Sequence, residues 1–385
     1  MKKVLGFKSS WILTEEGLKK TSLLIEDGII KKIGDFDMDG LIQLDENQIL
    51  IPGFIDQHIH GAMGSDAMDA TIKDLSIIAE GVAMEGTTAF LATTMTQSKE
   101  NIDKALVCVK KYIDENHEEG AEILGVHLEG PFISTKFVGA QPIEHVQIPN
   151  VENFKHYEET SGNHIKLITL APEEGDAVEL IKYLKSKGIV ASIGHTNATY
   201  EDCKKAIEAG ASNITHTYNA QKPIHHREVG TVGSAMLFDE VNCEAICDGI
   251  HLSAPAIKLL WKNKPHDKFT LITDAMRAKG LPDGSVSELG GQAVYVKNGE
   301  ARLENGTLAG SVLKMNNAVS NVMRFLDLPL KDVVTYASAN PAKNLGVYDK
   351  MGSIKEGKLA NLVVVDQNVN VYMTIRNGKE IYHRI

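Results

Sequence analysis

The sequence has few cysteines, no long hydrophobic run and no excess of positive charge, and each of these shortages argues against a class of protein. Four cysteines in 385 residues, none in a Cys-x-x-Cys pair, argue against a disulfide scaffold and against a dithiol redox motif. We interpret all four as reduced thiols that are mostly buried. They are Cys108, Cys203, Cys243 and Cys247.

The net charge of -11 argues against a nucleic-acid surface and leaves no basic stripe for a membrane. No apolar run approaches the length of a membrane span, and the first residues lack the apolar stretch of a signal peptide. We therefore expect a cytoplasmic protein that binds neither nucleic acid nor membrane. Its length suits one large α/β domain with an appendage, or two domains.

The middle of the chain alternates short β-branched runs with helical patterns, yet no Gly-x-Gly-x-x-Gly follows any of the runs. An open doubly wound sheet also fits this alternation, but it is disfavoured without that dinucleotide-binding fingerprint. Eight strand–helix units instead predict a (β/α)8 barrel of the TIM type. The predicted strands are 54–57, 88–93, 123–128, 166–170, 189–193, 213–215, 243–247 and 269–273. The clearest helical patterns are 71–84, 100–116, 176–186 and 200–208.

Both ends of the chain contain strand-like runs and tight turns rather than helical patterns. The dipeptides Asp27-Gly28 and Asn377-Gly378 each lie between two such runs, and both dipeptides are strong signals for a β-hairpin. We therefore expect the two ends to pair into one small β-sandwich domain. The predicted boundaries are residues 1–52 plus 348–385 for this domain and 53–347 for the catalytic barrel.

Polar residues gather where the predicted strands end. His58 and His60 alternate along the first strand, so their side chains point the same way. The third, fifth, sixth and eighth strands end close to further imidazoles and carboxylates, among them Glu129, His195, His216 and Asp274. Because the carboxyl ends of barrel strands meet at one mouth, we expect these side chains to converge there on a metal ion.

The types of ligand select the metal and the reaction. Neutral imidazoles with a carboxylate suit zinc or iron(II) better than magnesium or calcium. Such a metal polarises a carbonyl and lowers the pKa of bound water to about 7. Asp274 beside that water can accept its proton and return it to a leaving amine. These parts predict hydrolysis of an amide or another C–N bond without a covalent intermediate.

Nine segments spread over essentially the whole chain carry a specific resemblance. They are PGFIDQHIHG (52–61), GVHLEGPF (125–132), IGHT (193–196), THTYNAQ (215–221), CDGIHLS (247–253), LITDAM (271–276), TLAGS (307–311), NPAKNLG (340–346) and GSIKEGKLANLVVVD (352–366). The chain resembles the amidohydrolase superfamily and, within it, the family of N-acetylglucosamine-6-phosphate deacetylases. The resemblance implies hydrolysis of the N-acetyl group of that phosphosugar to glucosamine 6-phosphate and acetate, in amino-sugar catabolism.

The resemblance also implies roles for single residues. A metal would be held by Glu129, His195 and His216, and Asp274 would be the catalytic acid and base. Contacts with substrate are assigned to Ala140, Gln141, Asn219, Ala220, His226, Arg227, Asp248, His251, Leu308, Ala309 and Gly310. A phosphate dianion needs a fixed cation, and residues 225–227 follow the sixth strand at a spacing that lets Arg227 reach back over the mouth.

Three features depart from what the resemblance implies. Many members of the superfamily bridge two metals with a carboxylated lysine at the fourth strand, but residues 169–172 contain no lysine, so Glu129 is expected to be the anionic ligand or bridge. Some related deacetylases lack the His-x-His pair and use one metal, whereas His58 and His60 favour a second, giving one or two metals per subunit. Gln141 stands where some members carry a histidine, and an amide can donate a hydrogen bond there but not a proton.

Other functions remain open at this point. An N-acetylgalactosamine-6-phosphate deacetylase differs at one hydroxyl of the substrate, which the sequence does not resolve. Dihydroorotase or hydantoinase chemistry is disfavoured by the missing lysine. A non-catalytic scaffold is disfavoured because every metal position and Asp274 are kept. Related deacetylases are usually dimers, so we expect a homodimer in which loop 222–228 lies near the subunit boundary and His226 serves the phosphate pocket of the neighbour.

Overall fold

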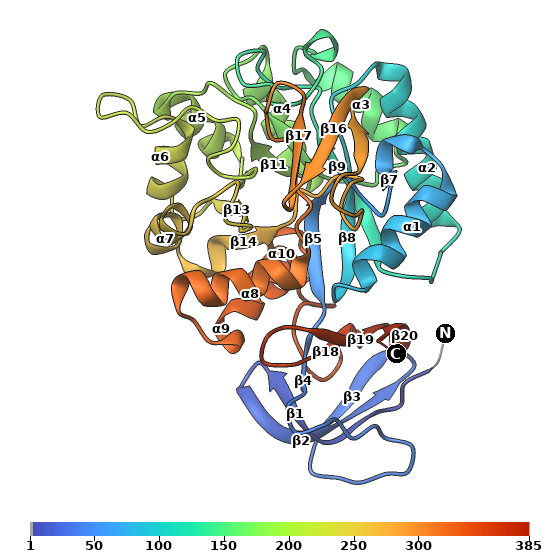
Figure 1. The fold of residues 1–385 in the computed structure, drawn as a ribbon. Helices are drawn as coiled ribbons and strands as arrows, with labels where there is room; N and C mark the ends of the chain where they lie inside the picture. Colours follow the sequence, from blue (N-terminus) through green and yellow to red (C-terminus); the bar gives the residue numbers. More distant parts are fainter. Residues whose placement is uncertain (1–2, 385) are drawn as a thin grey trace.

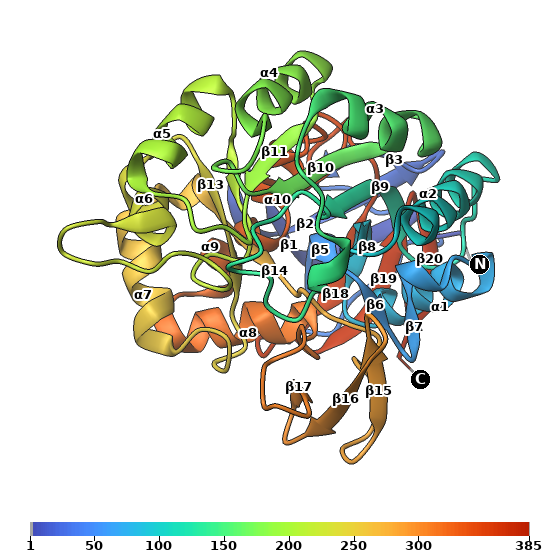
Figure 2. The ribbon, with the colours of Figure 1, turned by 90° about the horizontal axis from the view of Figure 1, so that it is seen from above.

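Eight parallel strands stand at the centre of the molecule, and a second sheet built from both ends of the chain lies beneath them (Figure 1). The computed structural model describes residues 3–384. Seen from above, helices surround the central strands as an outer ring (Figure 2). The predicted architecture, a (β/α)8 barrel with an appended β structure, is confirmed.

The barrel strands pair in chain order, each parallel to the next. They are β5 (Phe54–Ile59), β8 (Thr87–Thr94), β9 (Glu122–Glu129), β10 (Ile165–Leu170), β11 (Val190–Ile193), β12 (Asn213–Ile214), β13 (Asn242–Ile246) and β14 (Phe269–Ile272). The ring closes just beyond β14, where Ile59 and Ala275 form a parallel bridge and the amide of Asp274 donates to the carbonyl of His58 over 2.9 Å. All eight predicted strands are confirmed.

Helices cover the outside of the barrel. They are α1 (Ile72–Ala83), α2 (Lys99–Asp114), α3 (Val151–Thr160), α4 (Ala177–Lys187), α5 (Tyr200–Ala209), α6 (Gly230–Leu237), α7 (Ala254–Asn263), α8 (Met315–Leu326), α9 (Leu330–Ala337) and α10 (Ala339–Asn344), with short 3-10 turns η1 (Ala67–Asp69), η2 (Ile143–His145) and η3 (His266–Lys268). Capping side chains fix where helices begin: Thr71 accepts from the amide of Asp74 at α1, and Thr199 and Asp202 form a reciprocal capping box at α5. The four helices predicted from the sequence are confirmed.

The barrel strands are buried on both faces, as their β-branched composition predicts. Every residue of β5 and of β8 is buried. The interior of the barrel also carries a hydrogen-bonded layer of polar side chains, including Gln57, Asn213 and Glu244, which extends from the middle of the strands to the first residue of β12 and is joined there by Asn344 of α10. The four cysteines are unpaired and buried, as expected, and burial raises the pKa of the Cys203 and Cys243 thiols to about 11.

The strands near both ends of the chain form a seven-stranded mixed sheet in the order β20-β19-β18-β4-β1-β2-β3. They are β1 (Gly6–Thr14), β2 (Gly17–Glu26), β3 (Ile29–Gly34), β4 (Ile49–Pro52), β18 (Leu362–Val365), β19 (Val371–Arg376) and β20 (Lys379–His383). Both predicted hairpins are confirmed. Asp27-Gly28 has φ angles of 49° and 79° and Asn377-Gly378 has 49° and 71°, the left-handed pair that a type I′ turn requires. β4 leads directly into β5, so this sheet lies at the amino-terminal end of the barrel (Figure 1).

A three-stranded antiparallel sheet beside the mouth was not predicted (Figure 2). It consists of β15 (Val286–Leu289), β16 (Gln292–Lys297) and β17 (Glu300–Leu303), inserted between β14 and α8. Its inner residues Leu289 and Leu303 pack in one cluster with Met95 and Met276 of the barrel mouth. A two-stranded ribbon, β6 (Gly61–Ala62) and β7 (Ser65–Asp66), follows β5. No helix within residues 3–384 is long and apolar enough to cross a membrane.

Candidate active site

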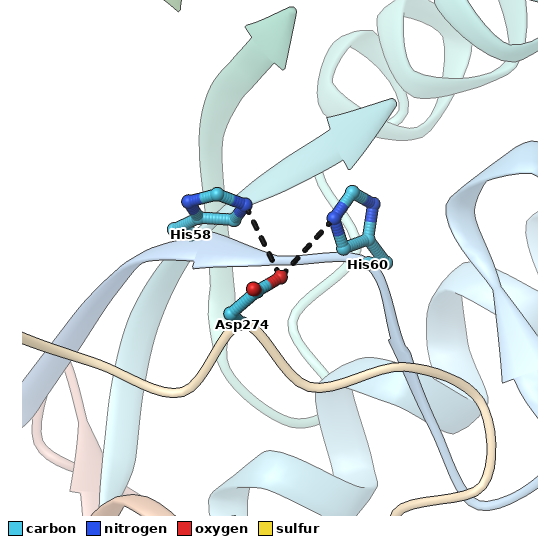
Figure 3. Close-up of side chains that lie close together, drawn as sticks. All are labelled: His58, His60 and Asp274. Atoms are coloured by element: carbon cyan, nitrogen blue, oxygen red, sulfur yellow. Dashed lines mark ion pairs between the residues drawn. The ribbon is translucent and has the colours of Figure 1, made fainter. Parts of the chain in front are cut away.

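Two groups of three side chains meet at the mouth of the barrel, and in each group the candidate ligand atoms lie within 4.8 Å of one another. The His58 group contains His58, His60 and Asp274. His58 and His60 rise from the end of β5, and both rings face the carboxylate of Asp274, which follows β14 (Figure 3). Asp274 Oδ1 is 3.3 Å from His58 Nε2 and 3.4 Å from His60 Nε2.

The Glu129 group contains Glu129 at the end of β9, His195 after β11 and His216 after β12. Glu129 Oε1 is 3.3 Å from His195 Nε2 and 3.1 Å from His216 Nε2, and these two ring nitrogens are 3.1 Å apart. The structure thus brings together side chains that the sequence placed at one mouth, from strand ends that are far apart in the chain.

Glu129 lies between the two groups. Its Oε1 is 3.3 Å from His58 Nε2 and its Oε2 is 3.2 Å from His60 Nε2, so one carboxylate faces imidazoles of both groups. If metal ions bind at both groups, this one carboxylate would serve both. It fits the expectation that Glu129 takes this role in a chain without a lysine at the end of β10.

The donor set fits a divalent transition metal. Four imidazoles turn ring nitrogens towards shared carboxylate oxygens in a buried space, and His58 Nε2 has no hydrogen-bond partner among the described residues. Nitrogen lone pairs that face one another at 3.1 Å repel unless a proton or a cation lies between them. Imidazole nitrogens combined with carboxylate oxygens are the ligands that zinc and iron(II) accept.

The carboxylates of the two groups are held in their charged form. Burial raises the pKa of Glu129, but the charge of His58 and the hydrogen bonds from His195 and His216 outweigh it and hold the pKa well below its usual value. The same balance of burial against the charge of His58 and the hydrogen bond from His60 lowers the pKa of Asp274. Both acids are therefore ionised at neutral pH.

Three of the ligand residues adopt a left-handed backbone that residues other than glycine rarely occupy. The φ angles are 47° at His195, 28° at His216 and 47° at Asp274. Such conformations cost roughly 1–3 kcal/mol each and persist when surrounding contacts hold them. At Asp274 the amide donates to the carbonyl of His58, and its carbonyl accepts from the amide of Ser311 over 2.8 Å. These three residues therefore adopt the left-handed backbone at the points where the chain turns at the mouth.

A cavity of about 420 Å³ opens above the two groups, and we call it the mouth cavity. Seven of the residues expected to contact substrate line it. They are Ala140, Gln141, Asn219, Ala220, His251, Leu308 and Gly310. Gln141 is already engaged, because its Nε2 donates to Glu129 over 2.8 Å and its Oε1 accepts from the amide of Thr96 over 2.8 Å. Its amide therefore orients the bridging carboxylate.

Four expected contact residues do not line the mouth cavity. Asp248 accepts from His251 Nδ1 over 2.6 Å and faces a separate hollow, so it orients His251 from behind. Ala309 is fully buried behind the wall formed by its neighbours. His226 and Arg227 are exposed on residues 222–229, the projecting loop, which runs outward between α5 and α6 (Figure 2). The expectation that Arg227 reaches back over the mouth of its own barrel is therefore not met.

Sequence reasoning missed several residues of the site. Met95, Leu289, Arg302 and Thr307 also line the mouth cavity, and the last three come from the inserted sheet or the segment after it. Glu244 lies under both ligand groups. A signal for it was present, because a glutamate inside the otherwise apolar strand Cys-Glu-Ala-Ile is unusual in a buried sheet.

A larger hollow of about 670 Å³ lies at the other end of the barrel, against the terminal sheet. Glu15, Lys331 and Tyr348 are among the residues that line it. Neither ligand group reaches this hollow. We therefore locate the chemistry at the smaller mouth cavity, where the buried imidazoles and carboxylates converge.

A closed (β/α)8 barrel with two sets of imidazole and carboxylate ligands at its carboxyl end defines a class, the metal-dependent hydrolases built on this barrel. The chain belongs to the amidohydrolase family, whose model matches residues 49–381. This match confirms the resemblance drawn from the nine sequence segments at the level of the superfamily.

Comparison with individual proteins shows which enzymes of this family the chain is similar to. The N-acetylglucosamine-6-phosphate deacetylase of Bacillus subtilis (strain 168) is 47% identical over 339 residues, covering 88% of this chain and 85% of the relative. The crystal structure of the Thermotoga maritima deacetylase of the same name is similar with a TM-score of 0.89 and 37% identity, covering 98% of this chain and 100% of that one. A variant of the Mycobacterium smegmatis deacetylase, solved in complex with N-acetyl-D-glucosamine-6-phosphate, gives a TM-score of 0.92 at 28% identity, covering 99% and 100%.

Proposed function

We propose that this chain removes the acetyl group from N-acetylglucosamine 6-phosphate and releases glucosamine 6-phosphate and acetate. The observation that carries the proposal is the floor of the mouth cavity, where side chains of both metal-binding groups, the carboxylate of Asp274 among them, face the same space. The similarity to the deacetylases named above supports this substrate in particular.

The metal would be held by Glu129, His195 and His216, with a second position at His58, His60 and Asp274. When bound, a zinc or iron(II) ion polarises the acetyl carbonyl and lowers the pKa of water to about 7. Glu129 serves both positions, because its two oxygens face the rings of His58 and His60 as well as those of its own group. One or two ions per chain are therefore compatible with the residues present.

Asp274 carries the proton. Its ionised carboxylate faces the floor of the cavity, so it is placed to accept a proton from the attacking water. As the C–N bond breaks, the same carboxyl group returns that proton to the amine, which leaves as glucosamine 6-phosphate. The acetyl carbon keeps the water oxygen and leaves as acetate, the second proton of the water passing to the released amine or to solvent, and the carboxylate of Asp274 is regenerated.

The sugar is positioned by the cavity wall. His251 is held by Asp248 through both its ring Nδ1 (2.6 Å) and its backbone amide (2.7 Å), which fixes the direction of the ring that lines the cavity. Asn219 and Ala220, in the loop after β12, also line the cavity. A fixed imidazole and backbone groups suit hydroxyl and phosphate oxygens of the ligand.

We also propose a homodimer in which the projecting loop serves the neighbour. His226 and Arg227 are exposed at its outer end, and Ile224 beside them keeps 48% of its surface exposed. A cation placed outside its own cavity and next to an apolar residue suits a second subunit better than open water. The division of the chain into a small domain (1–52 and 348–385) and a barrel (53–347), and a cytoplasmic location, stay predictions.

The direct test is an amine-release assay over acetylated amino sugars with and without a 6-phosphate, using metal-replete protein. We expect the highest kcat/KM for N-acetylglucosamine 6-phosphate, with N-acetylgalactosamine 6-phosphate as the matched comparison for the 4-hydroxyl. Equal or faster turnover of the galacto sugar would reassign the substrate. No release from any sugar by metal-replete protein would refute the deacetylase function.

The dimer is tested by mixing two inactive variants, Asp274→Asn and His226→Ala/Arg227→Ala. A shared cavity predicts recovered activity, because one of the two sites in a mixed dimer then carries both intact parts. No recovery from demonstrably mixed dimers would confine the phosphate site to one chain.

Arg227→Ala alone should lower kcat/KM for the phosphorylated sugar by about ten- to a hundredfold, since a charge-assisted contact contributes roughly 1.5–3 kcal/mol. Turnover of unphosphorylated N-acetylglucosamine should hardly change.

A further inference from the structure

Glu244 is a fully buried carboxylate in the middle of β13, directly below the two ligand groups. Its Oε1 accepts from Gln57 Nε2 over 2.6 Å and from Asn213 Nδ2 over 3.2 Å. Its Oε2 lies 3.2 Å from His58 Nδ1 and accepts from the amide of His216 over 3.2 Å. Each of its oxygens is thus surrounded by donors, as a buried charge requires.

The contact with His58 fixes the state of that ring. Because a carboxylate only accepts, Nδ1 keeps its proton, and when the ring is neutral, as a metal ligand must be, the lone pair is on Nε2, which faces Glu129 and Asp274. A carboxylate behind a ligand imidazole raises the basicity of the ligand nitrogen and holds the ring in place. His58 therefore lies between Glu244 on one side and the carboxylates of Glu129 and Asp274 on the other.

The four ligand histidines differ in what holds their outer nitrogen. His58 Nδ1 meets the charged Glu244, and His195 Nδ1 meets the neutral carbonyl of Phe137 at 2.9 Å. The outer nitrogens of His60 and His216, both Nδ1, have no hydrogen-bond partner among the described residues. Each group thus has one anchored imidazole, and only the anchor of the His58 group carries a charge.

We propose that Glu244 is a positioning residue that sets the metal affinity of the His58 group. This inference rests on the metal positions of the proposed function, and it assigns a task to a residue that touches neither substrate nor metal. Glu244 contacts the Glu129 group only through the backbone amide of His216, where it helps to hold a φ of 28°. Its effect on that group is therefore expected to be smaller.

The test compares metal binding by Glu244→Gln and wild type. Glu244→Gln keeps the size of the side chain but removes its charge. It also places an amide N–H next to groups that are themselves hydrogen-bond donors. Metal-free protein is titrated with Co²⁺, which reports coordination by its visible absorption. The same titration of two further variants assigns the bound Co²⁺ equivalents: the one lost in His58→Asn belongs to the His58 group, and the one lost in His195→Asn belongs to the Glu129 group. We expect binding at the His58 group to weaken by about 10–100-fold and binding at the Glu129 group to change by less than about threefold.

Thr270→Val is the matched control. Thr270 is the register partner of Glu244 on β14, and its Oγ1 donates to Asn242 Oδ1 over 2.7 Å rather than to Glu244, so the substitution removes a polar contact of the same buried layer while every hydrogen bond of Glu244 is kept. It should leave both affinities near those of wild type. Unchanged binding in Glu244→Gln, equal weakening at both groups, or equal weakening in Thr270→Val would each overturn the proposal. A wild-type chain that binds a single equivalent would overturn it too. Failure to deacetylate any sugar, with both equivalents bound normally, would instead count against the proposed function alone.

Wild-type protein gives a second test if Glu244→Gln does not fold. In zinc-loaded protein with ¹⁵N-labelled histidine, His58 is identified as the ring signal missing from His58→Asn. We expect its proton on Nδ1 and its metal on Nε2. The opposite arrangement, with the proton on Nε2, would show that Glu244 does not determine which nitrogen of His58 carries the proton.

Discussion

The two ends of the barrel are made from different kinds of side chain. At the mouth, His58, Glu129 and Asp274 are buried although they are polar or charged, and several of their neighbours have left-handed backbones. At the opposite end, Phe54 opens β5 and is fully buried next to the terminal sheet, where an added methyl at Gly86 would come within 3.0 Å of it and 3.1 Å of Val363. At the lower end, apolar packing around Phe54 stabilises the contact between the barrel and the terminal sheet, and the polar side chains of the interior are neutral amides and hydroxyls that bond one another. The upper end keeps an arrangement of charges that apolar packing would not favour.

The comparison predicts that changes at the mouth remove activity while the fold is kept. The largest effect is expected for His216→Asn, which takes one ligand from the Glu129 group. Turnover should be abolished and metal content should fall, while circular dichroism and the cooperativity of unfolding stay close to wild type. Full metal content in this variant, measured by elemental analysis, would remove His216 from the ligands.

Asp274→Asn sharpens the comparison, because it keeps the shape of the mouth and removes the base. A positioned general base contributes roughly 10²–10⁴-fold to the rate, or about 3–5 kcal/mol of barrier, and we expect the upper end because this carboxylate acts on both water and amine. In wild type, kcat/KM should also fall on acidification as Asp274 takes up a proton, and only below the ordinary carboxyl range since its pKa is lowered. A variant that retains a tenth of normal kcat would contradict this role.

Phe54→Ala tests the other end. Removing a fully buried phenyl ring should lower the free energy of unfolding by about 3–5 kcal/mol, because a cavity is left in a packed core. Urea unfolding at fixed metal concentration measures this loss, and kcat at a temperature where the variant is folded should stay near wild type. Phe54→Leu, which fills most of the space, is the control and should cost less than about 1.5 kcal/mol. A large fall in kcat in folded Phe54→Ala would mean that the two ends are not separable.

The smallest effect is expected at Glu15, whose carboxylate joins the terminal sheet to the segment after the barrel. Burial raises its pKa, but hydrogen bonds from Lys355, Ser353 and Tyr348 outweigh it and bring the pKa to about 2. Because this lies below the value of about 4.5 in the unfolded chain, ionised Glu15 stabilises the fold above pH 4.5, and the contribution is lost as the pH falls towards 2.

Glu15→Gln should therefore destabilise the protein at pH 7 by about 1 kcal/mol, a figure reduced for solvent screening, and by less at pH 3.5. Glu16→Gln is the neighbouring control, since Glu16 pairs only with Lys19 at the surface. Equal unfolding free energies of wild type and Glu15→Gln at pH 7 would show that the contacts of Glu15 contribute nothing measurable.

Much of the barrel and of the site could be predicted, because both follow from local patterns. The β-branched runs specify buried parallel strands whatever their partners, and eight of them can close in only one common way. His195, His216 and Asp274 could be placed together since each follows a strand end, and strand ends share one face. The two hairpin dipeptides fixed turns whose φ angles depend on the dipeptide alone.

The parts that could not be predicted depend on contacts between distant segments. The inserted sheet β15–β17 is held by Leu289 and Leu303 against Met95 and Met276, and no local pattern shows which surface such residues will cover. Arg302 lines the mouth cavity for the same reason. The projecting loop was wrongly expected to reach back over the mouth of its own barrel, because its polar composition does not reveal in which direction it runs. The role proposed for Glu244 could not be predicted from the sequence, because it depends on the register between β13 and its neighbouring strands.

The terminal sheet brings remote positions of the chain side by side. Lys3 and Lys379 form an antiparallel bridge, and the amide of Ile33 donates to the carboxylate of Glu356, 323 positions away. Closing so long a loop is entropically costly and slow. A circular permutant, joined near the present ends by a short linker and opened at the exposed turn 239–240, would make the sheet a local structure. The long-range pairing would then move to the seam between β12 and β13, and we expect the terminal sheet to form earlier in folding than it does in the present chain.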